Sequence, residues 1–346
     1  MLRLIAVLVL VAAALQAQDL RLAVAREPVS AILDAFHEHD IIALTEGEHR
    51  NQQSAAFRLA LIRDPRFATV VNDIVVESGS ARYQETIDRF IRGETVSDAE
   101  LRHVWQDTIG PDGLWDVPLY EEFFRAVRQV NAALPPARQL RVLLGDPPVD
   151  WDSVHTREEW VRLLPSRDTF AAGLIQREVL SKHRRALLVW GYTHFLKRPP
   201  FGSSLVTRLE AGCAGCVFTI WTHTGANDLR TVQADVAGWR TPSFALTKGT
   251  VLGATGYSFI SSKEAGGSPA ADGPRMEEEF DALIYLGPPS GLTYAQIAPS
   301  LCADAAYLKM RLARMDLTDP PDLPRPPGVR RSADVLKEYC AGVTPK

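Results

Sequence analysis

The chain has 346 residues, of which 46% are hydrophobic and 23% charged, and this composition excludes a largely disordered or fibrous protein. Its 38 lysines and arginines are outnumbered by 42 aspartates and glutamates, which gives a formal net charge of −4. That charge argues against a nucleic-acid binder, because such proteins need clustered basic side chains.

The N-terminus has the pattern of a secretory signal peptide. Arg3 is followed by an apolar run over residues 4–15 and then by small residues suited to cleavage. This run is shorter than the roughly 20 residues that a membrane span needs, and no later run reaches that length. We predict a signal peptide over residues 1–17 and a periplasmic or secreted protein with no membrane span. A buried N-terminal helix is the alternative.

Short apolar runs rich in Val, Ile and Leu recur along the chain, and we predict that each is a strand. They cover residues 41–44, 70–76, 140–144, 186–190, 217–221 and 281–286. Continuous hydrophobicity is typical of strands that are buried on both faces of a parallel sheet. Segments with helical spacing alternate with the first of these strands, around residues 57–62, 87–91 and 123–130. The alternation predicts an α/β fold with a mainly parallel central β-sheet flanked by helices.

Two segments interrupt this alternation, over residues 93–118 and 147–170, and both carry tryptophans. We predict that they are helical insertions beside the edge of the sheet that holds the active site. Their tryptophans, Trp115 among them, are expected to pack the insertions onto the sheet or to wall a pocket. Residues 261–275 are rich in Gly, Ser, Pro and Ala, which predicts a mobile loop.

The C-terminal part of the chain differs in composition from the rest. Residues 318–330 are dense in proline, which predicts an extended strap, and Ser332 is placed to cap a short terminal helix. We assign residues 18–300 to one α/β domain and residues 301–346 to a C-terminal helix and proline-rich strap packed on that domain.

The chain has four cysteines, an even number that suits an oxidising compartment. Cys213 and Cys216 form a C-x-x-C pair, but no second pair or histidine pair follows at zinc-finger spacing. We favour a local Cys213–Cys216 disulfide and a Cys302–Cys340 disulfide that ties down the tail. Free thiols or a metal site are the alternatives.

Polar and titratable residues follow the C-terminal end of five predicted strands. These residues are Glu46, Glu48 and His49, then Glu77, then Asp146, then Tyr192 and His194, and last His223. The carboxyl ends of parallel strands meet at one edge of the sheet, where ligands bind. One such residue alone is usually a helix cap or a solvated loop residue. Five groups together, beside Gly or Ser residues that let the backbone turn tightly, predict a functional site.

The sequence lacks the signatures of several common chemistries. It has no G-x-S-x-G nucleophile elbow, no G-x-G-x-x-G after the first strand and no P-loop. What remains is histidine with carboxylates, and a neutral imidazole held by a glutamate takes a proton from water that attacks a carbonyl. Arg58, nine residues after His49, is placed to neutralise a carboxylate or to steady an oxyanion.

These residues resemble a known family, the erythromycin esterases. That family has a Glu-x-x-His motif after a strand, an Arg nine residues later and a Glu at the end of the next strand, which Glu46, His49, Arg58 and Glu77 match in spacing. The likeness extends over residues 38–290. The family typically has two histidines after a Trp-Ala pair, whereas this chain has Trp190-Gly191-Tyr192-Thr193-His194.

The resemblance implies a role for each matching residue. His49 is the general base for water, Glu46 and Glu77 orient it or bind the nucleophile, Arg58 supports the carboxylates, and His194 is a second histidine of the site. The resemblance therefore implies an exported hydrolase that acts on an ester or a related carbonyl in a small-molecule substrate. Substrate contacts are expected from four further residues, which are Glu48, Tyr192, Asp146 and His223.

Two alternatives stay open at the level of the sequence. The wider superfamily includes ChaN-like haem-binding lipoproteins, so a periplasmic haem or metal binder that uses His49, His194 or Tyr192 is one of them. A metal-dependent hydrolase is the other, with His49, His194 and Glu77 as a two-histidine, one-carboxylate set. We assign no cofactor and no metal ligand from the sequence, although a metal or haem remains possible.

Overall fold

The computed structural model describes residues 20–200, 202–223, 236, 238–256, 274–326 and 328–343. The predicted signal peptide lies outside the described residues, as does the predicted loop 261–275 except for its last two residues. None of the described helices is both long enough and apolar enough to cross a bilayer.

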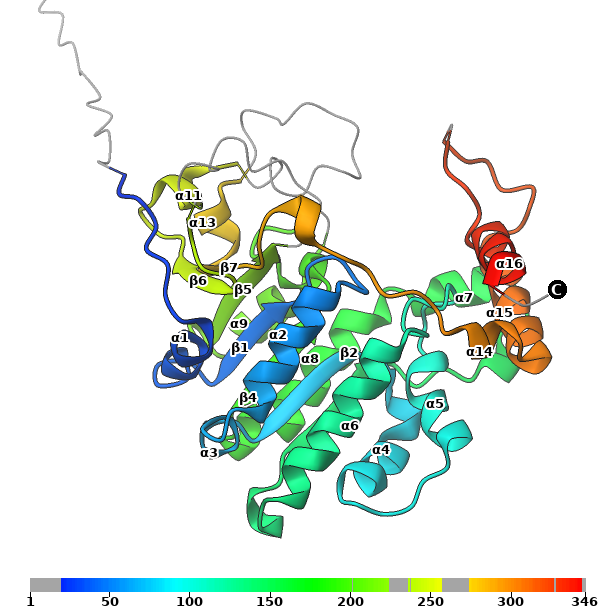
Figure 1. Ribbon diagram of the computed structural model, residues 1–346, viewed down its shortest axis with the longest axis horizontal. Helices are drawn as coiled ribbons and strands as arrows, with labels where there is room; N and C mark the ends of the chain where they lie inside the picture. The colour runs from blue at the N-terminus through cyan, green and yellow to red at the C-terminus, as the bar shows by residue number, and fades with distance from the viewer. Residues whose placement is uncertain are drawn as a thin grey trace, which may run out of the picture.

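The described strands form one sheet of seven strands in the order β3-β2-β4-β1-β5-β7-β6 (Figure 1). All neighbouring strands are parallel except β6 and β7, which are antiparallel. The strands are β1 Ile41–Thr45, β2 Asp73–Ser80, β3 Arg141–Asp146, β4 Ala186–Trp190, β5 Val217–His223, β6 Ser243–Leu246 and β7 Ala282–Tyr285. The predicted α/β class and the mainly parallel sheet are therefore confirmed.

Helices cover both faces of this sheet (Figure 1). The longer ones are α1 Pro28–Ala35, α2 Gln52–Arg63, α4 Gln84–Ile91, α5 Asp98–Gln106, α6 Pro118–Ala132, α7 Arg157–Leu163, α8 Ser166–Glu178, α9 Leu205–Glu210, α15 Ala305–Thr318 and α16 Ser332–Val343. Short helical turns are α3 Phe67–Val70, α11 Val251–Ala254, α13 Met276–Glu279 and α14 Pro299–Cys302.

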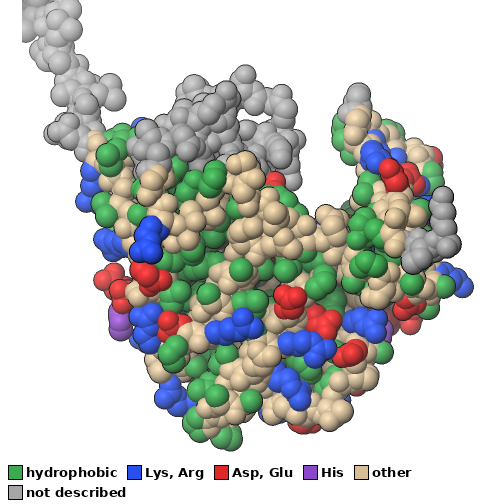
Figure 2. Space-filling view, in the orientation of Figure 1, with side chains coloured by type: hydrophobic (Ala, Val, Ile, Leu, Met, Phe, Trp, Pro, Cys, Tyr) green, Lys and Arg blue, Asp and Glu red, His purple; other side chains and the backbone are tan. Residues whose placement is uncertain are grey.

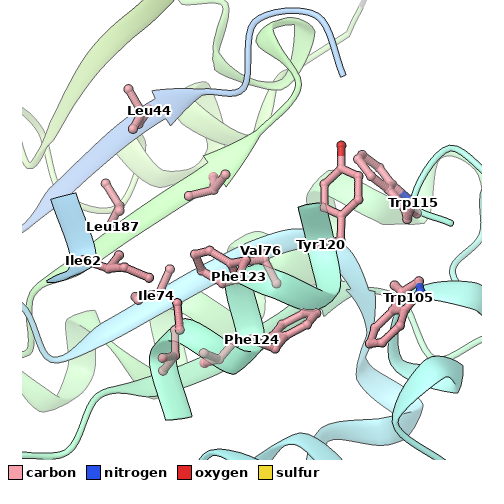
Figure 3. Packing of buried hydrophobic residues seen from close by; sticks show 14 of the residues in the cluster. Leu44, Ile62, Ile74, Val76, Trp105, Trp115, Tyr120, Phe123, Phe124 and Leu187 are labelled. Carbon is pink, nitrogen blue, oxygen red and sulfur yellow. The ribbon is translucent and has the colours of Figure 1, made fainter. Parts of the chain in front are cut away.

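Alternate residues of each strand enter two separate hydrophobic cores. Leu44 and Val76 point to the face covered by α2 and α6, where they join Phe123 and Phe124 in one cluster (Figure 3). Ala43 and Val75 point to the opposite face, toward α8 and α9. Burial on both faces explains why the strands read as unbroken apolar runs.

Two details of the strand prediction are wrong. The run 70–76 begins in the short helix α3, and its strand starts only at Asp73, because a short apolar run fits a helix as well as a strand. Strand β6 was not predicted, since it has only four residues and pairs at the edge of the sheet with β7 alone.

The C-terminal helices α14, α15 and α16 stand at one side of the molecule, and Figure 2 shows a notch between them and the rest of this face. The Cys302–Cys340 disulfide joins α14 to α16, and the Cys213–Cys216 disulfide closes the turn between α9 and β5. Both favoured pairings are confirmed. The terminal helix is present as predicted, but Ser332 is its first residue rather than the cap that precedes it, and residues 319–326 are irregular.

Candidate active site

The order of the strands brings the predicted site residues together. Asp146 ends β3, and Glu46 and Gly191 directly follow β1 and β4. Glu77 lies within β2, level with the end of β4, because Val76 pairs with Val189. These four strands are consecutive neighbours in the sheet. Because parallel strands end at one edge, residues that are more than 100 positions apart in the chain meet there.

The turn after β1 places His49 over the end of the sheet. Gly47 has a φ of 72°, in the left-handed region that glycine adopts without strain, and this lets the chain reverse immediately after Glu46. Asn51 then caps α2, because its side chain accepts a hydrogen bond from the Ser54 N–H at 2.8 Å.

Glu46 holds His49 through a hydrogen bond of 2.7 Å between its Oε2 atom and His49 Nδ1. A carboxylate only accepts, so Nδ1 carries the hydrogen and Nε2 is left as the basic nitrogen of the neutral ring. Glu46 is itself fixed by Arg58, 3.4 Å from its Oε1, and by the Tyr120 hydroxyl, which donates to Oε2 at 3.2 Å. These contacts hold Glu46 in place beside His49, and the roles that the family resemblance implies for Glu46 and Arg58 stay predictions.

The pKa of His49 lies above its ordinary value. Burial against the edge of Trp115, whose ring centroid is 4.7 Å away, lowers this pKa. The hydrogen bond to Glu46 and the negative charges of Glu46, Glu77 and Asp112 raise it and outweigh the burial. His49 therefore becomes a neutral base at a higher pH than an ordinary histidine does.

A second cluster centres on Glu77. Arg167 Nη2 donates to Glu77 Oε1 at 2.8 Å, and the Gly191 N–H donates to Oε2 at 2.7 Å. His194 Nε2 lies 3.3 Å from Oε1, while its Nδ1 contacts Asp168 Oδ1 at 2.5 Å. His194 therefore stands between two carboxylates.

The charges of this cluster shift the pKa values of its members. Burial opposes ionisation of Glu77, but the charges of Arg167 and His194 hold the pKa of Glu77 well below its usual range. Burial lowers the pKa of His194, yet Glu77 and Asp168 raise it to about 9. At neutral pH His194 is thus an imidazolium, which suits it to stabilise negative charge but not to act as a base.

Asp146 contributes by holding Arg167. Its Oδ1 accepts from Arg167 Nε at 2.9 Å, and its Oδ2 accepts from the Ile109 N–H at 2.5 Å. Burial and the neighbouring Glu77 raise the pKa of Asp146 to about 6, although Arg167 and the Ile109 N–H oppose this shift. The contact with Arg167 gives Asp146 a positioning role, while its predicted contact with substrate stays a prediction.

Gly191 is the point where the two clusters meet. A Cβ atom at this position would lie 3.3 Å from both Glu77 Oε2 and His49 Nε2, which is closer than ordinary van der Waals contact. Nε2 of His49 therefore faces the Glu77 cluster, and the absence of a side chain at Gly191 lets the two approach each other.

We expect Gly191→Ala to lower the rate of the ester hydrolysis predicted for this site by roughly tenfold. The added methyl group would displace His49 or Glu77, and displacements below 1 Å in an active site have effects of that order. Gly191 has a φ of −61°, which alanine adopts freely, so the fold should persist. Gly173→Ala on α8 is the matched control, since a Cβ there meets nothing within 4 Å. Initial rates and thermal unfolding curves of the two variants provide the comparison. Equal turnover in both would contradict the close approach at Gly191.

The remaining predicted residues lie around this centre. Glu48 accepts a hydrogen bond from Tyr294, and Tyr192 is half-buried against the core on the α8 side. His223 is fully buried at the end of β5, with its ring centroid 5.4 Å from that of Trp221. Their contacts with substrate stay predictions.

Sequence reasoning missed Arg167, Asp168 and Tyr120. Arg167 and Asp168 lie in the first turn of α8, and Tyr120 lies in the first turn of α6, so none of them follows a strand. For Arg167 and Asp168 the one available signal was that residues 147–170 were predicted to be an insertion beside this edge, and Tyr120 lies outside that segment. That signal is too coarse to choose individual side chains.

The predicted metal set of His49, His194 and Glu77 does not fit a metal ion. Both ring nitrogens of His194 are engaged with carboxylates, and Glu77 is engaged by Arg167 and Gly191. Within the described part of the chain, no group of three or more His, Cys, Asp or Glu side chains is arranged to hold a metal.

Comparisons with known proteins find similarity in structure only. No family model and no curated protein sequence matches the chain. A succinoglycan biosynthesis protein is 8% identical, with a TM-score of 0.53 over 80% of this chain and 96% of that one. A Bacillus cereus protein is 11% identical, with a TM-score of 0.51 over 80% and 97%.

A third solved structure is a mutant of the erythromycin esterase EreC in its open conformation, 14% identical, with a TM-score of 0.51 over 78% of this chain and 94% of that one. Identities this low bear on the arrangement of the backbone and not on the activity. The resemblance that the Glu-x-x-His motif suggested is therefore confirmed in the fold, and this chain has the α/β fold of the erythromycin esterase structure.

Proposed function

We propose that the protein is an exported hydrolase in which His49 takes a proton from a water molecule that attacks the carbonyl carbon of an ester. The observation that carries this proposal is the 2.7 Å contact between His49 Nδ1 and the buried Glu46, with Nε2 turned toward the Glu77 cluster. A carboxylate on Nδ1 fixes the tautomer that accepts a proton at Nε2, as in other histidine bases.

The second cluster holds two cations, Arg167 and His194, among its carboxylates. As water attacks, its proton passes to His49 Nε2, and negative charge develops on the carbonyl oxygen. The side chains of His194 and Arg167 are 17% and 21% exposed, so both cations are partly open to a ligand. As the ester C–O bond breaks, the leaving alkoxide takes up the proton that His49 Nε2 received from water, which returns His49 to its neutral form.

Export and a small-molecule substrate are part of the proposal. The two disulfides support export, because such bonds persist in oxidising compartments outside the cytoplasm. A site built from single side chains at the edge of a sheet suits a small carbonyl compound.

We expect the purified protein to hydrolyse activated esters such as 4-nitrophenyl acetate, with a rate that is insensitive to a chelator. The base form of His49 grows as pH rises through its pKa, which is raised, so the ascending limb should have its midpoint above about 6.5. The rate should fall again near pH 9, where His194 loses its proton. Rates from pH 5 to 10, with and without EDTA, test this. A rate that EDTA abolishes, or one with no ascending limb, would contradict it.

A further inference from the structure

The loop between α5 and α6, residues 107–117, is buried over much of its length although it has no regular secondary structure. We call it the Trp115 loop. Buried backbone N–H and C=O groups need hydrogen-bond partners. A loop lacks the regular backbone hydrogen bonds of a helix or a sheet, so these partners must come from elsewhere. Its conformation therefore depends on side chains that reach it from other elements.

The Trp115 loop contacts both halves of the candidate site. Trp115 lies edge-on to the ring of His49 and also to Tyr120, 4.9 Å away, which is visible beside it in Figure 3. At the other end of the loop, the Ile109 N–H donates to Asp146, the residue that holds Arg167. A displacement of this loop would thus change the surroundings of both His49 and Arg167.

Helix α15, nearly 200 residues later in the chain, holds the loop in place. Arg311 is only 1% exposed, and its Nη2 donates to Gln106 O at 3.1 Å and to Asp116 Oδ1 at 3.0 Å. Its Nη1 donates to Pro111 O at 3.2 Å. One planar guanidinium therefore joins three points in and beside the loop, which a lysine cannot do. Tyr307 adds a 2.5 Å hydrogen bond to the same Asp116 carboxylate.

The loop has space to move if these contacts are lost. A pocket of about 340 Å³ that is open to solvent lies beside it, lined on the loop side by Asp112 and Leu114 and on the side of the C-terminal helices by Met315, Leu336 and Tyr339. Trp115 and Val117 are buried in the hydrophobic core, and the polar contacts from α15 add to that packing on the side where this pocket leaves it incomplete.

We propose that Arg311 is a positioning residue of the active site. It fixes the Trp115 loop so that Trp115 packs against the ring of His49 and the Ile109 N–H holds Asp146 against Arg167. The C-terminal helices then contribute to the structure of the active site. The effect on turnover rests on the proposed hydrolase function, whereas the effect on the accessibility of His49 to a reagent does not.

The test measures how fast diethyl pyrocarbonate modifies each histidine, resolved by peptide mass spectrometry. We expect Arg311→Lys to raise the modification rate of His49 by about tenfold, the factor that corresponds to losing one charge-assisted hydrogen bond from the closed loop. The rate at exposed His37 should not change and serves as the internal reference. Turnover of an activated ester should fall in parallel.

Tyr307→Phe is the second variant, because it removes a single hydrogen bond to Asp116 and keeps the volume of the side chain should Arg311→Lys fail to fold. Lys309→Met, which removes an exposed cation from the same helix, is the control. Faster His49 modification in the folded Tyr307→Phe or Arg311→Lys protein, but not in Lys309→Met, supports the proposal. An unchanged His49 rate in the folded variants overturns it. Absence of esterase activity in the unmodified protein would contradict the proposed function. The rate of His49 modification would still decide whether Arg311 positions the loop.

Discussion

Replacing His49 by alanine is expected to lower kcat on an activated ester by about 10²- to 10⁴-fold, the range that removal of a general base produces. The fold should survive, because the His49 side chain is 27% exposed. Glu46 also keeps Arg58 and Tyr120 as partners, so no buried charge is left alone. Stopped or initial-rate assays over pH, together with thermal unfolding curves, provide the measurement.

The control for this experiment is His37→Ala, which removes an exposed imidazole near the end of α1, remote from the candidate site. Its turnover should equal that of the unmodified protein. Turnover in His49→Ala that equals the control would remove His49 from the role of base. The Glu77 cluster would then be left as the only candidate centre among the residues that the structure describes.

Replacing Glu77 by glutamine is expected to lower the free energy of unfolding by roughly 3 kcal/mol, near the lower end of the cost of breaking a buried ion pair. Glutamine retains the shape and still accepts the Gly191 N–H, but it removes the charge between Arg167 and His194. The loss stays near that lower end because Arg167 keeps Asp146 as a partner. Urea unfolding at pH 7 measures it.

The same variant should change how stability depends on pH. The pKa of His194 is raised from 6.5 to about 9, so its interactions contribute stability that is fully present below about pH 6.5 and is lost as pH rises through 9. This shift corresponds to roughly 3 kcal/mol. Without the Glu77 charge the pKa of His194 falls, and the loss of stability should begin at a lower pH.

Glu178→Gln is the matched control for this variant. Glu178 ends α8 at the protein surface and pairs with Lys182 at 2.7 Å and Arg141 at 3.4 Å. Exposed pairs of this kind contribute less than about 1 kcal/mol. If Glu77→Gln and Glu178→Gln unfold at the same urea concentration, with the same pH dependence, the Glu77 cluster does not stabilise the fold.

Much of the sheet was predictable because its strands are buried on both faces. The run 186–190 corresponds to β4 without error, and the predictions for β1, β3, β5 and β7 differ only at their ends. Hydrophobic continuity marks such strands in any sequence. Strand β6 carries no comparable signal, since a four-residue edge strand buries too little to stand out.

The site was predictable only in the part that follows strands. Glu46, His49 and Glu77 were visible because they come directly after apolar runs. Arg167 and Asp168 were not, because a charged residue in the first turn of a helix is ordinary at the surface as well. Only the packing of α8 against the edge of the sheet distinguishes these two from other charged residues on helices.

The amino-acid sequence by itself determined that this chain forms a buried parallel sheet and that acids and histidines follow its strands, because both properties depend on residues close together in the chain. The tertiary structure alone decided that β4 lies between β2 and β1, which places His194 beside Glu77 and Gly191 against His49. Strand order comes from pairing between distant segments and leaves no local pattern. The protonation of His194 depends in turn on that order, since only neighbouring charges raise its pKa.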